Sequence, residues 1–377
     1  MTKLRVRTPA ELIAAVPYMI GFHPADSLVV AAIKDRHLAF AARIDLPEPG
    51  DPGAGAPVLH LATIVADQQP DAIAIIGYGD SGRVTPSLRD LSDALTRAGV
   101  PIIDELRVAD GRFWSYLCAK PSCCPREGKP CDPPDSVLAV EATFAGAVAL
   151  ASRSVLEDRL AAATGSERKA MDEADARAQS RLREMTAKIA TDRADLAVRL
   201  DRAMVRAGRA AIRQAERAAR AGKRLTDDEV AWLGYLMTSV QVRDYAWVRT
   251  AAEHWDISLW TDVVRRINPE RVPAPASLLA FIAWQAGLGP LASIAVERAL
   301  DADDTYGMAE TMLTTLYAAL PPSAVEGWPA PKATARSRAS GSQSKTGPGN
   351  GNSTGFEHKP GGGSAARKAR YRTRRRV

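Results

Sequence analysis

The segment SLVVAAIKDRHLAFAARIDL, residues 27–46, decides the fold of the first part of the chain. It contains two mostly apolar runs, 27–33 and 38–46, with the polar stretch KDRH at 34–37 between them. Apolar runs of this length that contain several Val and Ile residues and flank a polar turn are typical of paired strands. The segment therefore predicts a β-hairpin.

The flanking sequence extends this hairpin into a layered domain. Thr8 and Glu11 have capping-box spacing with Pro9 between them, which predicts a helix from Pro9 to about Met19. Further along, the pattern of apolar residues predicts the remaining elements. These are helices at 58–69 and 87–98, a buried strand at 72–76, and strands at 102–108 and 113–117 around a turn at Asp110 and Gly111. Residues 1–132 thus predict an α/β or α+β layered N-terminal domain.

The second part of the chain has a helical composition. No proline occurs between Pro134 and Pro269, and this stretch is rich in Ala, Arg, Leu and Glu. It predicts a long helical segment at 135–222, with breaks at Gly165, Gly208 and Gly222. A second capping box, Thr226 with Glu229, opens a helical domain at 226–322. The expected fold is an α/β N-terminal domain followed by an all-α C-terminal domain.

Residues 272–296 form an uncharged stretch of 25 residues, which raises the question of a membrane span. Proline and glycine divide it into pieces shorter than the roughly 20 apolar residues that a span requires. We expect a buried helical hairpin and no membrane association. The spacing of five residues resembles part of one tetratricopeptide unit and its junction with the next, so a tetratricopeptide-like domain is one alternative: Ala292, Ala299, Asp304, Tyr306 and Ala309.

The C-terminal segment, residues 331–377, carries 12 Lys or Arg residues and one acid. The whole chain has 50 basic and 44 acidic residues, so residues 1–330 hold 38 against 43, a formal charge of −5. The segment also has almost no large apolar residues, which predicts a disordered basic tail. Its partner would be nucleic acid or another polyanion; a solubilising role is the alternative. The candidate nucleic-acid-binding residues are Arg367, Lys368, Arg370, Arg372, Arg374, Arg375 and Arg376.

A second basic pattern lies within the long helical segment. Its arginines follow one another at steps of three or four, which places them on one arc of about 80° of a helix. They are Arg199, Arg202, Arg206, Arg209, Arg213, Arg217, Arg220 and Arg224. This pattern indicates either a solvated face or a surface for phosphates or an acidic partner. No base-reading motif accompanies it, so sequence-specific recognition is not expected.

All four cysteines, Cys118, Cys123, Cys124 and Cys131, fall in one loop. Four thiolates can bind zinc, so these residues are candidate metal ligands. However, the loop lacks a CxxC pair, and adjacent cysteines such as Cys123 and Cys124 point apart in extended backbone. We therefore expect reduced structural thiols and no cofactor, with zinc or a redox-sensitive disulfide as alternatives. Nearby Lys and Arg residues could lower a thiol pKa.

Two further motifs suggest chemistry. Gly77, Gly79 and Gly82 match G-x-G-x-x-G after a predicted strand. We expect the next helix to start at Thr85–Pro86, beyond the last glycine, and Asp80 to place a carboxylate where a phosphate would bind, so no nucleotide site is predicted. The polar residues at 23, 26 and 27 (His, Asp and Ser) suit a hydrolase triad by type, but turn and cap roles are the expected ones. No catalytic residue is assigned.

Several stretches together resemble a known family. They are LIAAVPYMIGFHPADSLVV at 12–30, Tyr78, GRFWSYLC at 111–118, CCP at 123–125 and ASIAVERALDADDTYGMA at 292–309. The chain, over about residues 4–320, resembles the bacterial domain-of-unknown-function family 4192. The resemblance implies a cytoplasmic protein of a high-GC bacterium and brings no reaction, ligand or functional residue. The tail lies outside it.

These observations lead to one functional expectation and one alternative. The first 17 residues contain four charged side chains and no sustained apolar run, so no secretory signal is expected. We expect a non-enzymatic cytoplasmic binding or regulatory protein whose tail associates with nucleic acid non-specifically and whose helical domain could bind a protein partner. The alternative is an enzyme or metal-dependent module with its site near the cysteine loop.

Overall fold

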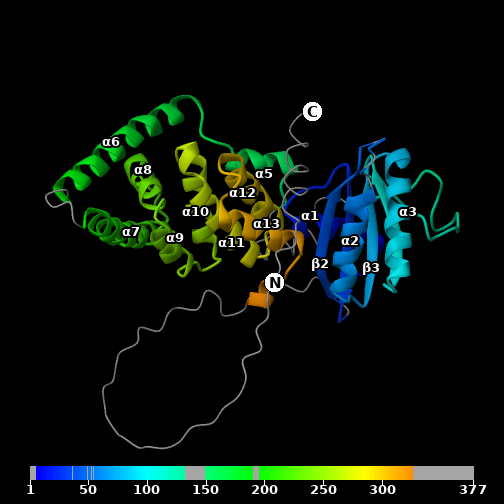
Figure 1. Ribbon diagram of the computed structural model, residues 1–377. Helices are drawn as coiled ribbons and strands as arrows, with labels where there is room; N and C mark the ends of the chain where they lie inside the picture. The colour runs from blue at the N-terminus through cyan, green and yellow to red at the C-terminus, as the bar shows by residue number, and fades with distance from the viewer. Residues whose placement is uncertain are drawn as a thin grey trace, which may run out of the picture. The chain divides into compact units, whose positions relative to one another are not determined.

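The computed structural model describes residues 6–131, except positions 36, 49, 52 and 54, and residues 149–189 and 195–325. A mixed six-stranded sheet with helices occupies the first of these ranges, and helices make up most of the other two (Figure 1). The sheet has the strand order β2-β1-β3-β4-β5-β6. Its strands are β1 (Ser27–Lys34), β2 (His37–Asp45), β3 (Ala72–Tyr78), β4 (Ile102–Ala109), β5 (Arg112–Ser115) and β6 (Lys129–Pro130).

The predicted hairpin is confirmed. β1 and β2 pair antiparallel, with Ser27 opposite Asp45 and Lys34 opposite His37. β1 also pairs antiparallel with β3, so it lies inside the sheet, and its first six residues are buried. β2 pairs with β1 alone among the described strands, and most of its residues are half-buried.

The rest of the sheet is built around one parallel pair. β3 and β4 are parallel, and helix α3 (Ser81–Arg97) connects them. β4 and β5 then pair antiparallel through a tight turn. Asp110 and Gly111 in this turn have φ values of 50° and 70°, which are typical of a two-residue hairpin turn. The turn that we predicted at these positions is confirmed.

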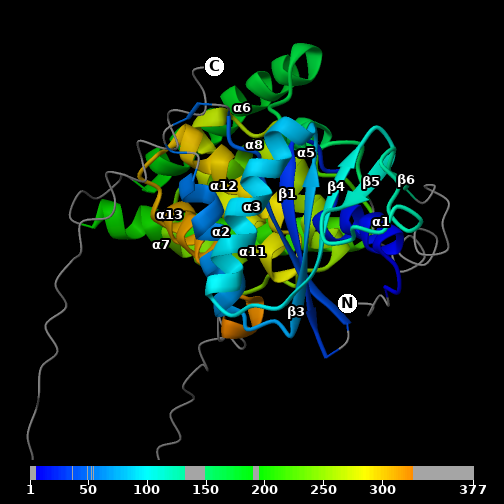
Figure 2. The same cartoon turned by 90° about the vertical axis from the view of Figure 1, so that its right-hand side faces the viewer.

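The core of this part lies between the sheet and two helices. Helix α2 (Gly55–Asp67) and α3 lie against one face of the sheet (Figure 2). Alternate residues of β1 and β3, such as Val30 and Ile75, pack with Leu61 of α2 and Leu91 of α3. Helix α1 (Pro9–Ile20) precedes the sheet. Thr8 caps it as predicted, and Gly21 at φ 84° ends it. The Glu11 carboxylate, however, accepts from the amide of Arg7.

The predicted start of α3 was wrong. The helix begins at Ser81, inside the glycine run, because the Asp80 side chain accepts a hydrogen bond from the Gly82 amide at 2.7 Å and caps the helix. Pro86 lies within the helix, where it removes one backbone hydrogen bond without ending the helix.

The second part of the described chain contains nine α-helices. They are α5 (Arg153–Leu160), α6 (Gly165–Ile189), α7 (Leu196–Arg220), α8 (Asp227–Leu236), α9 (Val240–Trp247), α10 (His254–Arg266), α11 (Pro273–Gln285), α12 (Gly289–Ala302) and α13 (Gly307–Tyr317). Two short 3-10 helices, η1 (Pro269–Arg271) and η2 (Pro322–Val325), accompany them. The Thr226–Glu229 capping box is confirmed, with both reciprocal hydrogen bonds present.

Of the three predicted breaks, two are confirmed and one was wrong. Gly165 opens α6 and Gly222 follows the end of α7, both at positive φ. Gly208, in contrast, lies inside α7. A Cβ atom there would lie 2.4 Å from the Val242 side chain, so glycine allows α7 and α9 to pack closely. The glycine at position 208 therefore reflects close helix packing and not the end of a helix.

The predicted buried hairpin corresponds to α11 and α12. Twelve of the thirteen residues of α11 are buried, and the helix contacts α9, α10, α12 and α13. Among the residues that the structure describes, no helix is long and apolar enough to cross a membrane.

A buried arginine joins two of the helices. The Arg266 side chain, at the end of α10, is only 1% exposed. Its guanidinium donates to Asp227 at 2.7 Å, to Asp262 at 3.1 Å and to the Leu225 carbonyl at 2.8 Å. Every nitrogen of the guanidinium therefore has an acceptor, which is the condition for burying this charge.

Candidate functional site

The cysteine loop, residues 116–128 between β5 and β6, is organised by Trp114. The indole N–H donates to the Arg126 carbonyl at 3.0 Å, and the ring lies against Gly128. The Arg107 guanidinium carbon lies 3.7 Å from the centroid of the same ring. A strand residue thus holds the far end of the loop in place, a role that the sequence pattern did not reveal.

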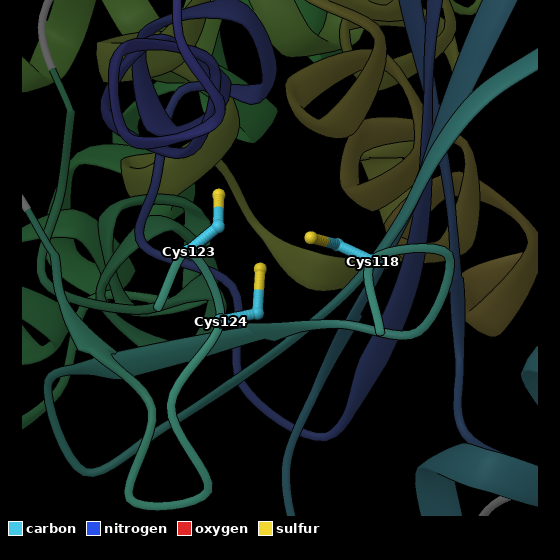
Figure 3. Close-up of side chains that lie close together, drawn as sticks. All are labelled: Cys118, Cys123 and Cys124. Atoms are coloured by element: carbon cyan, nitrogen blue, oxygen red, sulfur yellow. The ribbon is translucent and has the colours of Figure 1, made fainter. Parts of the chain in front are cut away.

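Three of the four candidate cysteines come together in this loop. The sulfur atoms of Cys118, Cys123 and Cys124 all lie within 4.8 Å of one another, and the Cys118 side chain is directed toward the other two (Figure 3). The amides of Cys123 and Cys124 both donate to the Lys120 carbonyl, at 3.0 and 2.7 Å. This backbone is turned and not extended, so the expectation that adjacent cysteines would point apart was wrong.

The fourth candidate, Cys131, is not part of this group. Its amide donates to the Gly111 carbonyl at 2.8 Å, next to the pairing of β5 with β6. Burial, with a smaller effect of Cys131, raises the pKa of the Tyr78 hydroxyl. None of the four cysteines, all of which the structure describes, forms a disulfide.

The thiols of the group differ in their proton affinity. A hydrogen bond from the Lys120 amide, and then one from the Cys124 thiol, lower the pKa of Cys118. Hydrogen bonding to Cys118, with partial burial, raises the pKa of Cys124 to about 12. The Lys129 ammonium lies 3.8 Å from the Cys123 sulfur. The arrangement favours a thiolate at Cys118 with Cys124 as its proton donor.

A small cavity adjoins this group. It has a volume of about 140 Å³ and lies beside Cys124, between β5 and the end of the loop. Trp114, Arg126 and Lys129 contribute to its wall. Its lining therefore combines aromatic rings with cationic side chains.

The glycine run at residues 77–82 leads into the N-terminus of α3, where the Asp80 carboxylate already accepts a hydrogen bond from one of the first amides. Because α3 starts at Ser81, the helix does open inside the run, and one reason for rejecting a nucleotide site no longer holds. The other reason stays: the Asp80 carboxylate caps the helix through the Gly82 amide, in the place where a phosphate would bind. The absence of nucleotide binding stays a prediction.

The His23, Asp26 and Ser27 side chains do not form a triad. Asp26 accepts from Arg83 at 2.8 Å, while the Ser27 hydroxyl donates to the Ala25 carbonyl and accepts from Arg43 at 3.0 Å. Among the described contacts, no hydrogen bond links the three side chains. Each polar group of Asp26 and Ser27 has a structural partner instead.

The arginine face of α7 is the second candidate site. Its seven arginine residues are all exposed, while Ile212 and Ala215 on another side of the helix are buried. The face consists of Arg199, Arg202, Arg206, Arg209, Arg213, Arg217 and Arg220. Arg224, the eighth residue of the pattern, follows the helix and forms ion pairs with Glu167 and Asp262. Arg224 therefore does not belong to this face.

Two aromatic residues flank the arginine face. The Tyr245 hydroxyl on α9 accepts from Arg213 at 3.2 Å, and Arg209 lies 5.3 Å from the Tyr245 ring centroid. At the start of α10, Arg220 lies 4.3 Å from the ring centroid of Trp255. Both aromatic residues are half-buried. Helix periodicity could not show them, because they come from other helices.

Both acidic residues within α7 are bonded to groups outside the face. Glu216 is buried and pairs with Arg249, and Asp201 accepts from Gln241 at 3.0 Å. Arg199, Arg202 and Arg217 have no side-chain partner among the described residues. The candidate residues at 367–376 lie outside the described part of the chain.

A comparison with protein families settles the relationship of this sequence. The model of the family described as "Domain of unknown function (DUF4192)" matches residues 9–323, well over half of the chain. The chain belongs to this family. The resemblance noted in the sequence is thereby confirmed, and both the cysteine loop and the arginine face lie within the DUF4192 region. No curated protein and no solved structure matches the chain.

Proposed function

We propose that this DUF4192 chain is a binding or regulatory protein that associates with nucleic acid, without sequence specificity, through the arginine face of α7 and the basic tail. The observation that supports this proposal is the exposure of all seven arginines of the face. The basic residues at 367–376 would add to the same affinity, with Tyr371 available to stack on a base.

The charge distribution along α7 supports an anionic ligand. The seven arginines form six neighbouring pairs at steps of three or four. Like charges at this spacing destabilise a helix by about 0.2–0.5 kcal/mol per pair, so the face costs about 1–3 kcal/mol when no anion is bound. A polyanion along the face removes this repulsion and stabilises the helix.

The dimensions of the face also suit a nucleic acid. From Arg199 to Arg220 the helix rises about 32 Å, at about 1.5 Å per residue. A DNA duplex presents about one phosphate charge per 1.7 Å of axis, so several phosphates lie within reach of the face. Tyr245 and Trp255 beside the arginines provide aromatic surface of the kind on which single-stranded bases stack.

The helical part of the chain is also proposed to bind a protein partner. The small-residue spacing around α12 and α13 supports this proposal and a tetratricopeptide-like arrangement of these helices. Cytoplasmic location, bacterial origin and a disordered tail likewise stay predictions.

The test is duplex DNA binding by the full chain, measured by fluorescence anisotropy at several salt concentrations. If about six phosphates are neutralised, log K falls against log salt with a slope near −5. Changing the seven basic residues at 367–376 to Gln should flatten the slope most. Changing Arg206, Arg209 and Arg213 to Gln should weaken binding further. The matched control changes Arg89, Arg97 and Arg159, exposed arginines of other helices, to Gln and should leave binding nearly unchanged.

Two results would contradict the proposal. One is the absence of binding by the full chain at low salt. The other is an equal loss in the control triple and in the α7 triple, because binding would then depend on net charge alone. Full affinity without the tail charges would instead assign the binding to the folded part of the chain.

A further inference from the structure

The three clustered thiols have a geometry that goes beyond the proposed function. Within residues 6–131, 149–189 and 195–325, Cys118, Cys123 and Cys124 are the one group of three or more Cys, His or acidic residues with ligand atoms this close together. A tetrahedral zinc ion with Zn–S bonds of about 2.3 Å holds its sulfurs about 3.8 Å apart. The described sulfurs, within 4.8 Å, would have to approach one another by about 1 Å at most.

The loop is built to present these sulfurs together. Two successive amides donate to the Lys120 carbonyl, which orients Cys123 and Cys124 toward the same space as Cys118. Trp114 fixes the end of the same loop through the Arg126 carbonyl and through Gly128. Preorganised sulfurs reduce the ordering cost of binding a metal.

The surroundings suit a negatively charged thiolate complex. Three thiolates and one zinc ion carry a net charge of −1, and the Lys129 ammonium already lies 3.8 Å from the Cys123 sulfur. Cys123 is exposed and the other two cysteines are half-buried. With three protein ligands and an open side, the fourth coordination position is left to water or to an incoming ligand.

We propose that Cys118, Cys123 and Cys124 bind one thiophilic d10 cation, Zn²⁺ or Cu⁺. Soft thiolate ligands select these ions over hard cations such as Mg²⁺. Binding forms three sulfur–metal bonds and releases to solvent the protons that the three thiols carry. No electron is transferred. Cys131 is not a ligand.

The experiment uses the full chain, reduced and freed of metal, under anaerobic conditions. In one arm the protein competes with a chromophoric chelator for Zn²⁺, and in the other with a Cu⁺-specific chelator for Cu⁺. We expect one metal ion per chain in at least one arm, and the arm that gives the tighter binding identifies the ion. Three of the four thiols should become protected from alkylation when the metal binds.

Single substitutions identify the ligands. Cys118→Ser, Cys123→Ser and Cys124→Ser should each weaken binding by at least about tenfold, since losing a ligand costs no less than losing a group that orients one. Cys131→Ser is the matched control, and it should keep both the stoichiometry and the affinity of the unchanged protein.

Three outcomes overturn the proposal. They are the failure of both ions to bind, an equal loss of affinity in Cys131→Ser, and protection of a set of thiols other than these three. A cystine between two of the clustered cysteines, in a protein that takes up neither ion after reduction, would replace the metal site by a redox-active pair. The alkylation pattern is read on the unchanged protein, so it decides the question even where a serine variant fails to fold.

Discussion

Gly128 lies against the indole ring of Trp114, and the space between them admits a hydrogen atom but no methyl group. A Cβ atom at position 128 would lie 2.5 Å from Cε2 of the ring, and the backbone φ of 76° favours glycine as well. Two independent constraints therefore require glycine at this point. The contact positions the loop that brings the three cysteines together.

Gly128→Ala should consequently destabilise the protein more than Gly111→Ala. Both glycines have positive φ, which costs an alanine about 1–2 kcal/mol. At Gly111 no atom beyond the adjacent residues lies within 4 Å of the added carbon, whereas at Gly128 overpacking adds about 1–3 kcal/mol. Denaturant unfolding of the two variants measures the difference. Equal losses would show that Trp114 moves away freely.

Arg266→Met should be much more damaging than Arg265→Met. The buried Arg266 pairs with Asp227 and Asp262, and its removal takes this cation from both carboxylates and leaves Asp262 with Arg224 alone. We expect a loss of about 2–3 kcal/mol, less than for fully buried pairs because both carboxylates still reach solvent. Arg265 pairs with Glu167 at the surface, so its loss should cost under about 1 kcal/mol. Unfolding curves that rank the two variants in the opposite order would contradict the buried network.

The stability contribution of Asp256 should depend on pH. Burial raises the pKa of this carboxyl group, even though the Ala251 amide and the Trp260 indole donate to it. A raised pKa means that the contribution is fully present below the unfolded value of about 3.9 and is lost as pH rises through the folded value. The unchanged protein should therefore exceed Asp256→Asn in stability by more at pH 4 than at pH 7. A difference that grows toward neutral pH would show that the charged form is favoured.

Asp80 should act as a helix cap and as an obstacle to phosphate. Asp80→Ala removes the acceptor for the Gly82 amide and should cost about 0.5–2 kcal/mol, whereas Asp80→Asn keeps an acceptor oxygen and should cost little. We expect millimolar NAD or ATP to leave the melting temperature of the unchanged protein where it is. A ligand at a hundredfold excess over its dissociation constant would stabilise by about 2.7 kcal/mol, so a clear shift would reveal a nucleotide site at this turn.

The sequence predicted the elements whose signals are local. The hairpin at 27–46, the Asp110–Gly111 turn and the cap at Thr226 depend on residues that are near one another along the chain, and the structure confirms them. The start of α3 was missed because Thr85 and Pro86 are also typical helix openers. Asp80, which precedes both residues in the chain, caps the helix, and Pro86 lies inside the helix without ending it.

In the two candidate sites, too, local sequence signals were predictable and contacts between distant parts of the chain were not. The arginine face follows from helical periodicity alone, but its neighbours Tyr245 and Trp255 depend on how α9 and α10 pack. For the cysteines, spacing suggested that Cys123 and Cys124 diverge, whereas a shared acceptor, the Lys120 carbonyl, turns them together. The Cys131 amide donates to the Gly111 carbonyl, and this backbone pairing keeps Cys131 apart from the other three cysteines. The spacing of the cysteines in the sequence could not predict this pairing.

The complete burial of α11 has a consequence for how the helical part opens. Four helices contact α11, and its residues 273–284 are all buried, so its amides reach solvent only when those neighbours separate. Hydrogen exchange in α11 therefore reports the free energy of global unfolding, while the exposed side of α7 exchanges through local fraying. This buried helix thus provides an internal reference against which the opening of the other described helices can be compared.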